Sequence, residues 1–522
     1  MNENTNVDML PSLGRPVRSQ NMGKMVDIDL SPYQSKTRGE HDPVQKPPVL
    51  LCQFDALEYY SYMLLSTQLN EQEVPHEVEI VDNDDRFIHQ IDKDFKDFPI
   101  IGFYCCNTDY QRVIGLVRRI KEIAPEKIII LGGPFPTLNY EDIDLTAVDF
   151  ICIGSGEFYF SEWIGQGHYK KKENFQNIVF DINQPFETKF VDDFNLSPKP
   201  NRAIYYDKYP FLKNMRVRRF LLSVGCPYKC TYCHNSNFND KFEAQGSVKL
   251  MFRSPENAIE EIISTLEKYP ADAISFSDDN LTISKNWFLT FIDLYIEKVN
   301  LPFLYSATVN TLGEEIVKKL GEAKARIARI AMETTNETIR KDILLRPKYT
   351  NDEFAEVIAN LKKHDIKVVM LNMFAIPTQT LEDCEEVFNF ANTHKVVMCT
   401  NVLVPYKGTA MYNYCLENDL LVEDYNTTDE GDLYINTASI KGEEMQRMVT
   451  MQNYTFLLNY VRPAIRLIKY LSKFKTFRQV SYKYITPINV TFMNFFGYLG
   501  LFTLRTMLPV GMRVIKSFIR SN

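Results

Sequence analysis

Short apolar runs alternate with amphipathic stretches along most of this chain. Over residues 47–170, the runs PPVLLCQF, HEVEIVDND, FPIIGFYCC, EKIIILGGPFPT and VDFICIGSGE have the length and composition of buried strands, and QRVIGLVRRIKEI has helical spacing. Strands that alternate with helices form parallel sheets with crossover connections. The pattern therefore predicts a Rossmann-like α/β domain over residues 47–170.

The alternation resumes after a proline-punctuated stretch at 171–214, which we interpret as a linker. Within residues 215–420 it gives six strand–helix steps, from RRFLLSVG to VMCTNVLVP. Consecutive steps of this kind indicate a partial or full β/α barrel, and we expect a (β/α)6 partial barrel.

The two ends of the chain differ from these α/β units. Residues 1–46 are polar and rich in Asn, Ser and Pro, which predicts a disordered tail. Residues 421–522 mix Leu, Ile, Phe and Tyr with Lys and Arg, and we expect a helical C-terminal cap there. A chain of 522 residues is long enough for two or three domains.

Charge is distributed unevenly along the chain. The formal net charge is −8, yet no Asp or Glu follows Glu444, and residues 445–522 carry twelve Lys or Arg, which leaves −20 on the rest. IRLIKYLSKFKTF is a basic amphipathic pattern typical of helices that lie on anionic membranes. We therefore expect peripheral membrane contact through residues 456–522, on the cytoplasmic side because the N-terminus shows no secretory signal.

The 21 uncharged residues at 484–504 leave several alternatives open. Their length allows a membrane span, although Pro487 and Asn489 weaken that interpretation. An interfacial helix or a mouth for a lipid substrate is the second alternative, and an ordinary packed cap is the third. RNA binding is the weakest, because no RNA-binding module is visible, and we expect no nucleic-acid partner.

Three of the ten cysteines follow a predicted strand with the spacing Cys226-x3-Cys230-x2-Cys233. Three thiolates this close can bind three irons of a 4Fe–4S cluster and leave the fourth iron open, as a catalytic cluster requires. A zinc knuckle completed by His234, or three unliganded buried cysteines, are the alternatives. A zinc ribbon would show a second ligand pair downstream, and the sequence has none.

With Tyr232 before the third cysteine, this segment resembles the signature of the radical S-adenosylmethionine (SAM) superfamily. The resemblance extends to FSDDN at 276–280, AMETT at 331–335, AIPTQT at 375–380 and PYKGT at 405–409. It implies that SAM binds the open iron and that an electron from a flavodoxin or ferredoxin splits SAM to methionine and a 5′-deoxyadenosyl radical.

The resemblance also implies a set of residues near SAM. These are Tyr232, Asp278, Asp279 and Glu333, and Arg346 could pair with the SAM carboxylate. Solvated carboxylates at strand ends and a surface arginine are the alternative interpretation. Thr378 replaces a usual glycine and Lys407 a usual proline in the family's turns, and a side chain in place of a glycine hinders close approach of the backbone to SAM.

An α/β sheet with GGPFPT and ICIGSGE ahead of such a barrel resembles the cobalamin-binding subfamily. This resemblance implies cobalamin contacts at the strand ends, by Gly132, Gly133, Thr137, Gly154, Gly156 and Glu157. Phe135 and Ser155 depart from the subfamily's usual segments, and D-x-H-x-x-G is absent, so no residue can be named as a cobalt ligand. A degenerate domain that has lost the cofactor is the alternative, and we interpret Cys105 and Cys106 as core residues.

The function that these resemblances imply is cobalamin-dependent C-methylation of a lipid, a peptide or another natural product. The first alternative is a radical oxidation, cyclisation or carbon–carbon coupling without cobalamin. The second is a non-catalytic iron–sulfur redox or scaffold protein. No catalytic residue can be assigned beyond the cluster cysteines.

Overall fold

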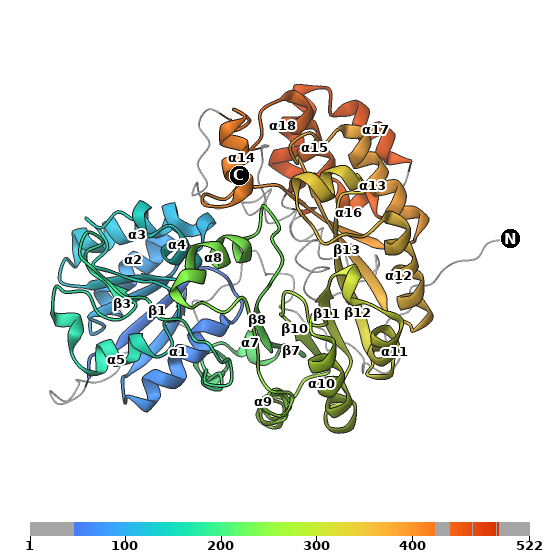
Figure 1. Cartoon of the computed structure of the whole chain (residues 1–522). Coiled ribbons are helices and arrows are strands. Elements are labelled where there is room, and N and C mark those ends of the chain that lie inside the picture. Colours follow the sequence, from blue (N-terminus) through green and yellow to red (C-terminus); the bar gives the residue numbers. More distant parts are fainter. Residues whose placement is uncertain (1–45, 423–438, 462, 487, 490–522) are drawn as a thin grey trace.

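The structure is a computed structural model that describes residues 46–422, 439–461, 463–486 and 488–489 (Figure 1). The predicted tail at 1–46 therefore lies outside the described residues except for Lys46, as do residues 490–522. Two α/β units lie side by side, and helices of the C-terminal region cover one end of the second unit (Figure 1).

The N-terminal unit is built on a six-stranded sheet with the order β2-β1-β3-β4-β5-β6. The first five strands are parallel, as the sequence predicts, and β6 is antiparallel to β5. Buried clusters cover both faces, which explains why β1 and β3 are apolar at nearly every position. The strands are β1 (Val49–Gln53), β2 (His76–Ile80), β3 (Ile100–Tyr104), β4 (Ile128–Gly132), β5 (Phe150–Cys152) and β6 (Ile178–Val179). The helices are α1 (Tyr60–Glu71), α2 (Asp84–Lys93), α3 (Tyr110–Ile123), α4 (Pro134–Leu138) and α5 (Tyr159–Gly165), with short 3-10 turns η3 (Asn107–Asp109), η4 (Tyr140–Asp142) and η5 (His168–Lys170).

The second unit contains a parallel six-stranded sheet with the order β14-β13-β12-β11-β10-β7. Its first and last strands stay at the edges, so the predicted partial barrel is confirmed as an open one. The strands are β7 (Val217–Phe220), β10 (Ala273–Phe276), β11 (Phe303–Ala307), β12 (Ala325–Glu333), β13 (Lys367–Phe374) and β14 (Val397–Val402). The connecting helices and turns are α9 (Pro255–Lys268), α10 (Lys285–Lys298), η7 (Val309–Thr311), α11 (Glu314–Glu322), η8 (Ile339–Ile343), α12 (Asn351–Lys363) and α13 (Leu381–Thr393).

An antiparallel pair and a helix interrupt the first step of the barrel. The chain continues from β7 into β8 (Ser223–Gly225), which pairs with β9 (Leu250–Phe252), and α8 (His234–Phe242) and η6 (Glu243–Gln245) lie between them. This insertion carries the three cysteines and lies between the two units (Figure 1).

The segment at 171–214, expected to be a linker, is packed into both units. It contributes β6 and two short helices, α6 (Ala203–Tyr206) and α7 (Pro210–Lys213). Tyr205 and Tyr209 are fully buried and bond to the first sheet, because the Tyr205 hydroxyl donates to Gln53 and the amide of Ile80 donates to the Tyr209 hydroxyl. The segment thus fixes the first unit against the second.

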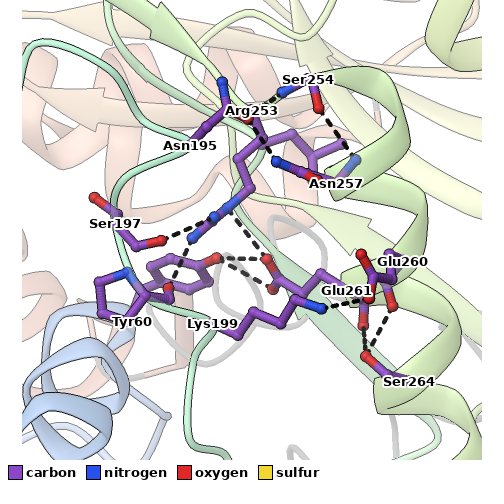
Figure 2. Close-up of polar contacts among 12 residues, drawn as sticks. Tyr60, Asn195, Ser197, Lys199, Arg253, Ser254, Asn257, Glu260, Glu261 and Ser264 are labelled. Atoms are coloured by element: carbon purple, nitrogen blue, oxygen red, sulfur yellow. Dashed lines mark hydrogen bonds and ion pairs between the residues drawn. The ribbon is translucent and has the colours of Figure 1, made fainter.

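A buried carboxylate also joins the two units (Figure 2). Glu261 in α9 accepts from the Tyr60 hydroxyl at 3.0 and 3.1 Å, and its carboxylate lies 3.3 Å from nitrogens of both Arg202 and Arg253. The side chains of Arg202, Arg253 and Glu261 are each at most 3% exposed. Breaking a buried pair of this kind costs about 3–5 kcal/mol, so the two arginines fix the carboxylate that binds Tyr60 of the first unit.

The C-terminal helices cover the free edge of β14. The Asn459 side chain accepts from the amide of Met398 at 2.8 Å and donates to its carbonyl at 3.0 Å, and Gln452 donates to the carbonyl of Thr400. Side-chain amides therefore pair the backbone groups that an edge strand leaves exposed. The helices are α14 (Ala410–Glu417), α15 (Glu443–Asn453), α16 (Thr455–Leu458), α17 (Ala464–Leu471) and α18 (Lys475–Val480), followed by the π-helical turn η9 (Ser481–Ile485).

No helix in the described part of the chain is long and apolar enough to cross a membrane. Most of the uncharged segment at 484–504 lies outside the described residues, so its three alternatives stay open.

Candidate active site

The three cysteines lie on one loop, residues 226–233, between β8 and α8, which we name the cluster loop. Gly225 opens it with φ +90°, and a side chain at this position would collide with the carbonyl of Lys249, the residue before the partner strand β9. Only glycine adopts this conformation without strain beside such a neighbour. Gly225 therefore sets the direction in which the loop leaves the β8–β9 pair.

The three thiols of the cluster loop are close enough for charge on one to affect the ionisation of another. Burial raises the pKa of Cys226, Cys230 and Cys233, that of Cys233 to about 11, and charge on Cys226 and Cys230 contributes to the shift at Cys233. Thiolates bind metals, so cluster assembly here would displace three protons. His234, a ligand in the zinc alternative, stacks on the Tyr406 ring with centroids 4.6 Å apart.

The described residues contain no group of three or more His, Cys, Asp and Glu side chains arranged to hold a metal ion. In a cubane cluster, by contrast, the three thiolates would each bind a different iron. The cluster loop supplies that number of thiols from one continuous segment.

Backbone contacts anchor the cluster loop to the barrel. Thr231 donates from its amide to the Leu344 carbonyl at 3.1 Å and from its hydroxyl to the Ile343 carbonyl at 2.7 Å. Its own carbonyl accepts from the amide of Met411 in α14 at 2.8 Å. The loop is thus held from two sides at a residue between two of the thiols.

Tyr232, Glu333 and Arg346 form one buried group beside the loop. The Tyr232 hydroxyl donates to Glu333 Oε1 at 2.7 Å, and Arg346 Nη1 lies 3.9 Å from the same oxygen. Arg346 also donates to Cys230 Sγ at 3.6 Å and to the Ala331 carbonyl at 3.2 Å. Burial and the Glu333 carboxylate raise the pKa of Tyr232, which keeps its hydroxyl protonated as a donor.

The backbone of Glu333 is strained. Its φ is +64°, at a register shift between β12 and β13. A non-glycine residue in this region costs of order 1–3 kcal/mol and persists where its surroundings impose it. The turn after β13 repeats the feature, because Ala375 has φ +58° and Thr378 has φ +68°, so Thr378 takes the conformation that a glycine would favour.

Asp278 and Asp279 differ in their surroundings. Asp278 is 2% exposed, and its Oδ1 accepts from the Leu222 amide at 3.1 Å and from the Ser223 hydroxyl at 2.5 Å. Burial raises the pKa of Asp278 to about 7. Asp279 instead accepts from Asn235, in the first turn of α8, and its charge raises the pKa of Cys226 and Cys233. Asp278 therefore supports the start of the loop, whereas Asp279 faces the thiols.

Sequence reasoning missed a polar network at the carboxyl ends of β10 and β11. Asn280 donates to the Thr308 hydroxyl at 2.8 Å, and the hydroxyls of Thr282 and Thr311 lie 2.6 Å apart. Thr308 directly follows β11, Asn280 and Thr282 lie in the segment after β10, and Thr311 lies in η7, so polar residues shortly beyond strand ends were the available signal.

The predicted cobalamin residues lie at the carboxyl ends of β4 and β5. Gly133 has φ +105°, and a Cβ there would lie 2.9 Å from the Cys105 carbonyl. Gly154 has φ +77° and faces the Phe190 ring, and its amide donates to the Thr137 hydroxyl at 3.0 Å. These contacts are made with protein atoms, so close packing of the turns already accounts for the two glycines.

The remaining predicted cobalamin residues also contact protein. Gly132 ends β4, and a Cβ on Gly156 would lie 3.0 Å from Cys152 Sγ. Glu157 accepts from the Ser197 hydroxyl at 3.3 Å, and burial raises its pKa.

A second polar group lies at the carboxyl ends of β1 and β3. Tyr59 donates to Asp55 at 2.7 Å and its ring lies 4.5 Å from that of Tyr104, while Cys106 Sγ donates to Asp109 at 2.7 Å. Burial, with the Asp109 charge, raises the pKa of Cys106 to about 12, so its thiol stays protonated.

Cys105, Cys106 and Asn107 follow one another in the chain and have different surroundings. Cys105 is fully buried in the core, as expected, whereas Cys106 belongs to the polar group. The buried Asn107 amide has no hydrogen-bond partner on either side-chain atom within the described residues. An unpaired buried amide at a strand end is consistent with a polar ligand there.

The carboxyl edge of the first sheet faces the cluster loop and its helix. Lys241 in α8 donates to the Leu138 carbonyl at 2.7 Å, and Lys407 pairs with Asp142 at 2.6 Å. Tyr406 stacks on His234. Burial raises the pKa of Tyr406 to about 12, and charge on the nearby Cys106 contributes to this shift. Side chains of both units therefore meet beside the loop.

Residues 220–391 match the radical SAM superfamily, and this range contains the three cysteines, Glu333 and Arg346. The chain carries a radical SAM domain. The cofactors that this family implies are a 4Fe–4S cluster and SAM, as the sequence predicts.

Two curated proteins are similar to this chain over long stretches. Bacteriochlorophyllide d C-8(2)-methyltransferase of Chlorobaculum tepidum is 22% identical over 354 residues, which cover 67% of this chain and 75% of that protein. Anaerobic magnesium-protoporphyrin IX monomethyl ester cyclase of Synechocystis sp. is 24% identical over 278 residues, 51% of this chain and 54% of that protein.

A solved structure has the same fold. The radical S-adenosylmethionine methyltransferase TsrM from Kitasatospora setae, solved with cobalamin and a [4Fe-4S] cluster, matches with a TM-score of 0.60 at 12% identity. The match covers 74% of this chain and 83% of that one. The predicted order of parallel sheet, partial barrel and helical region is thereby confirmed.

Proposed function

We propose that this radical SAM enzyme is a cobalamin-dependent C-methyltransferase. The observation that carries the proposal is the placement of the cluster loop: it faces the carboxyl edge of a Rossmann-like sheet and has the Tyr232–Glu333–Arg346 group at its side. Ligands of open α/β sheets bind at this edge. A relative named as a methyltransferase and the TsrM structure with cobalamin support the same assignment.

Cys226, Cys230 and Cys233 would hold the cluster, which when bound supplies the electron that splits SAM into methionine and a 5′-deoxyadenosyl radical. Asp279 and Glu333 offer carboxylates for the amino group of SAM, and Arg346 offers a guanidinium for its carboxylate. Tyr232 holds Glu333 in place through its 2.7 Å hydrogen bond. Asp278 holds the start of the cluster loop in position by accepting hydrogen bonds from the Leu222 amide and the Ser223 hydroxyl.

Cobalamin would bind at the ends of β1, β3, β4 and β5. Gly133, Gly154 and Thr137 shape the turns there, and the unpaired amide of Asn107 and the Tyr59–Tyr104 pair offer polar contacts beside them. When bound, cobalamin supplies the methyl group. Gly132, Gly156 and Glu157 complete this edge, and no side chain is assigned to cobalt.

The substrate class that we propose is a lipid, a peptide or another small natural product, with a flavodoxin or ferredoxin as the electron donor. The same proposal places the enzyme in the cytoplasm and includes peripheral contact of residues 456–522 with the inner face of a membrane, since this region is basic and free of acid. A lipid substrate would then reach the enzyme directly from the membrane.

Anaerobic reconstitution tests the proposal in two steps. Protein purified with iron, sulfide and hydroxocobalamin should retain both an EPR-active cluster and the corrin absorbance after gel filtration. With dithionite it should form 5′-deoxyadenosine from SAM. Replacing all three cluster cysteines by serine should abolish iron binding, whereas Cys384→Ala, a buried cysteine in α13, should preserve it.

Methyl transfer is tested with SAM that carries a deuterated methyl group and lipid or peptide extracts. A labelled product that forms only with cobalamin supports the proposal. A product that forms equally without it favours the second candidate, a radical cyclisation or oxidation, to which the cyclase relative points. A protein that binds iron and never cleaves SAM would refute both.

A further inference from the structure

Helix α17 has two apolar sides. Ile465 and Ile468 are each 4% exposed and pack into the core of the barrel unit. Leu467, Tyr470 and Phe474, spaced three and four positions apart from α17 into the turn that follows, are 57%, 56% and 50% exposed. A helix on the surface of a globular protein usually carries polar residues on its outer side. The outer side of α17 therefore needs a different explanation.

The same character continues along the next two elements. Val480 at the end of α18 is 46% exposed and Tyr484 in η9 is 49% exposed. We call these five side chains the C-terminal apolar face: Leu467, Tyr470, Phe474, Val480 and Tyr484. Tyr470 and Phe474 contact each other edge to face at 5.6 Å, so at least this part is continuous.

Exposed cations accompany this face. Within the described residues, Arg466, Lys473, Lys475 and Lys483 are exposed and form no ion pair. Lys473 lies over the Tyr470 ring and Lys483 over the Tyr484 ring, at 5.6 and 5.4 Å from the centroids. The positive charges thus border the apolar side chains directly.

Other cations of the same region are neutralised by acidic residues of preceding helices. Lys469 pairs with Glu382 and Glu385 of α13 at 2.8 Å, and Arg478 pairs with Glu443 at 3.1 Å. These pairs bind the helices to the rest of the protein. Within the described part of the chain the other four cations have no acidic partner, so their charge is available to an external one, and the sequence after Glu444 contains no acid.

We infer that the C-terminal apolar face docks on an anionic lipid bilayer, with Leu467, Tyr470 and Phe474 entering the headgroup boundary. The inference rests on the membrane contact included in the proposed function and is independent of methyl transfer. Aromatic and aliphatic side chains flanked by Lys and Arg are the composition of helices that lie in this boundary. Tyrosine suits it because the ring is apolar and the hydroxyl stays wet.

An anionic surface attracts each nearby Lys or Arg by about 1 kcal/mol, which is about a five-fold change in partitioning per residue. Replacing Lys473 and Lys475 by Gln should therefore weaken binding to vesicles of phosphatidylcholine and phosphatidylglycerol about 25-fold. Raising the salt concentration should also weaken the binding of the wild-type protein to these vesicles.

Flotation of the full-length protein with such vesicles tests the apolar part. Wild type should float with anionic vesicles and much less with pure phosphatidylcholine. The Tyr470→Gln/Phe474→Gln variant should lose most of the binding, while the matched control Leu196→Gln, an exposed leucine of the 171–214 segment that is 63% exposed, should float like wild type. Formation of 5′-deoxyadenosine in solution should be equal in all three, which shows that they are folded.

Three outcomes would overturn the inference, and a fourth would refute only the proposed enzymatic chemistry. Equal flotation of wild type and the Tyr470/Phe474 variant would assign binding to another part of the chain. Binding that is the same on neutral vesicles would remove the role of the cations. A dimer in light scattering that the variant converts to a monomer would make the face a contact between two copies. Loss of SAM cleavage in wild type would refute the proposed function and leave the flotation result intact.

Discussion

Asp278 makes a testable contribution to the pH dependence of stability. The carboxyl is buried, and its pKa of about 7 lies well above the usual value near 3.9 in an unfolded chain. The folded state therefore holds this proton more tightly than the unfolded state. The contribution of Asp278 to stability is complete below about pH 4 and is lost as the pH rises to about 7, where the carboxyl ionises without a compensating partner on Oδ2.

The Asp278→Asn variant isolates this contribution because asparagine does not titrate. Its carbonyl can still accept from the Leu222 amide and the Ser223 hydroxyl, and any cost of the unpaired amide nitrogen is independent of pH. One pKa unit corresponds to about 1.4 kcal/mol, so linkage predicts that wild type loses about 3 kcal/mol relative to the variant between about pH 5 and pH 8.

Urea unfolding of the metal-free protein, followed by circular dichroism across this pH range, measures the difference. The matched control is Asp85→Asn, whose side chain is 87% exposed and which should leave the pH profile of wild type unchanged. Parallel profiles for wild type and Asp278→Asn would show that the carboxyl is not buried as described. If the free energy of unfolding of wild type rose relative to that of the variant as the pH increased, the sign of the effect would be opposite to the predicted one and the reasoning would be refuted.

Three further substitutions have directions set by single contacts. Tyr232→Phe removes the hydroxyl that donates a hydrogen bond to the buried Glu333 carboxylate. It should lower the free energy of unfolding by about 2 kcal/mol, measured by urea unfolding of reconstituted protein. It should also lower the affinity for SAM at least ten-fold, measured by calorimetry. Unchanged affinity would separate Glu333 from SAM binding. Gly133→Ala should destabilise the first unit by about 1–3 kcal/mol, because of its φ of +105° and the Cys105 carbonyl, whereas Gly115→Ala, in α3 with nothing within 4 Å of the added methyl, should raise thermal stability slightly. If both alanines behaved alike in thermal unfolding, the strained turn would be refuted. Glu261→Gln should cost about 3–5 kcal/mol, because the buried arginines lose their countercharge; a urea midpoint equal to that of wild type would contradict the role of this contact between the units.

Local patterns made the two sheets and the cluster loop predictable. Each strand is a short apolar run, and the three cysteines lie within eight residues, so no long-range information is needed to find them. The sequence also indicated that Asp279 and Glu333 lie at strand ends, and the structure places both beside the loop. Whether they bind SAM stays a prediction.

Contacts between distant segments were not predictable in the same way. The bond from Tyr232 to Glu333 joins residues 101 positions apart, and that from Asn280 to Thr308 depends on the register of two strands. The segment at 171–214 has few apolar runs, yet its tyrosines are buried because two other units surround them. Cys106 and Asp109 are only three residues apart in the sequence, but the tertiary fold buries this pair at the end of its strand.

The ion triad around Glu261 has a consequence for how the enzyme works. Arg202 and Arg253 hold Glu261 in the orientation that accepts the hydrogen bond of Tyr60 from the first unit, so a hinge motion at this seam would break a bond to a buried carboxylate. The relative placement of the two units is therefore set when the chain folds.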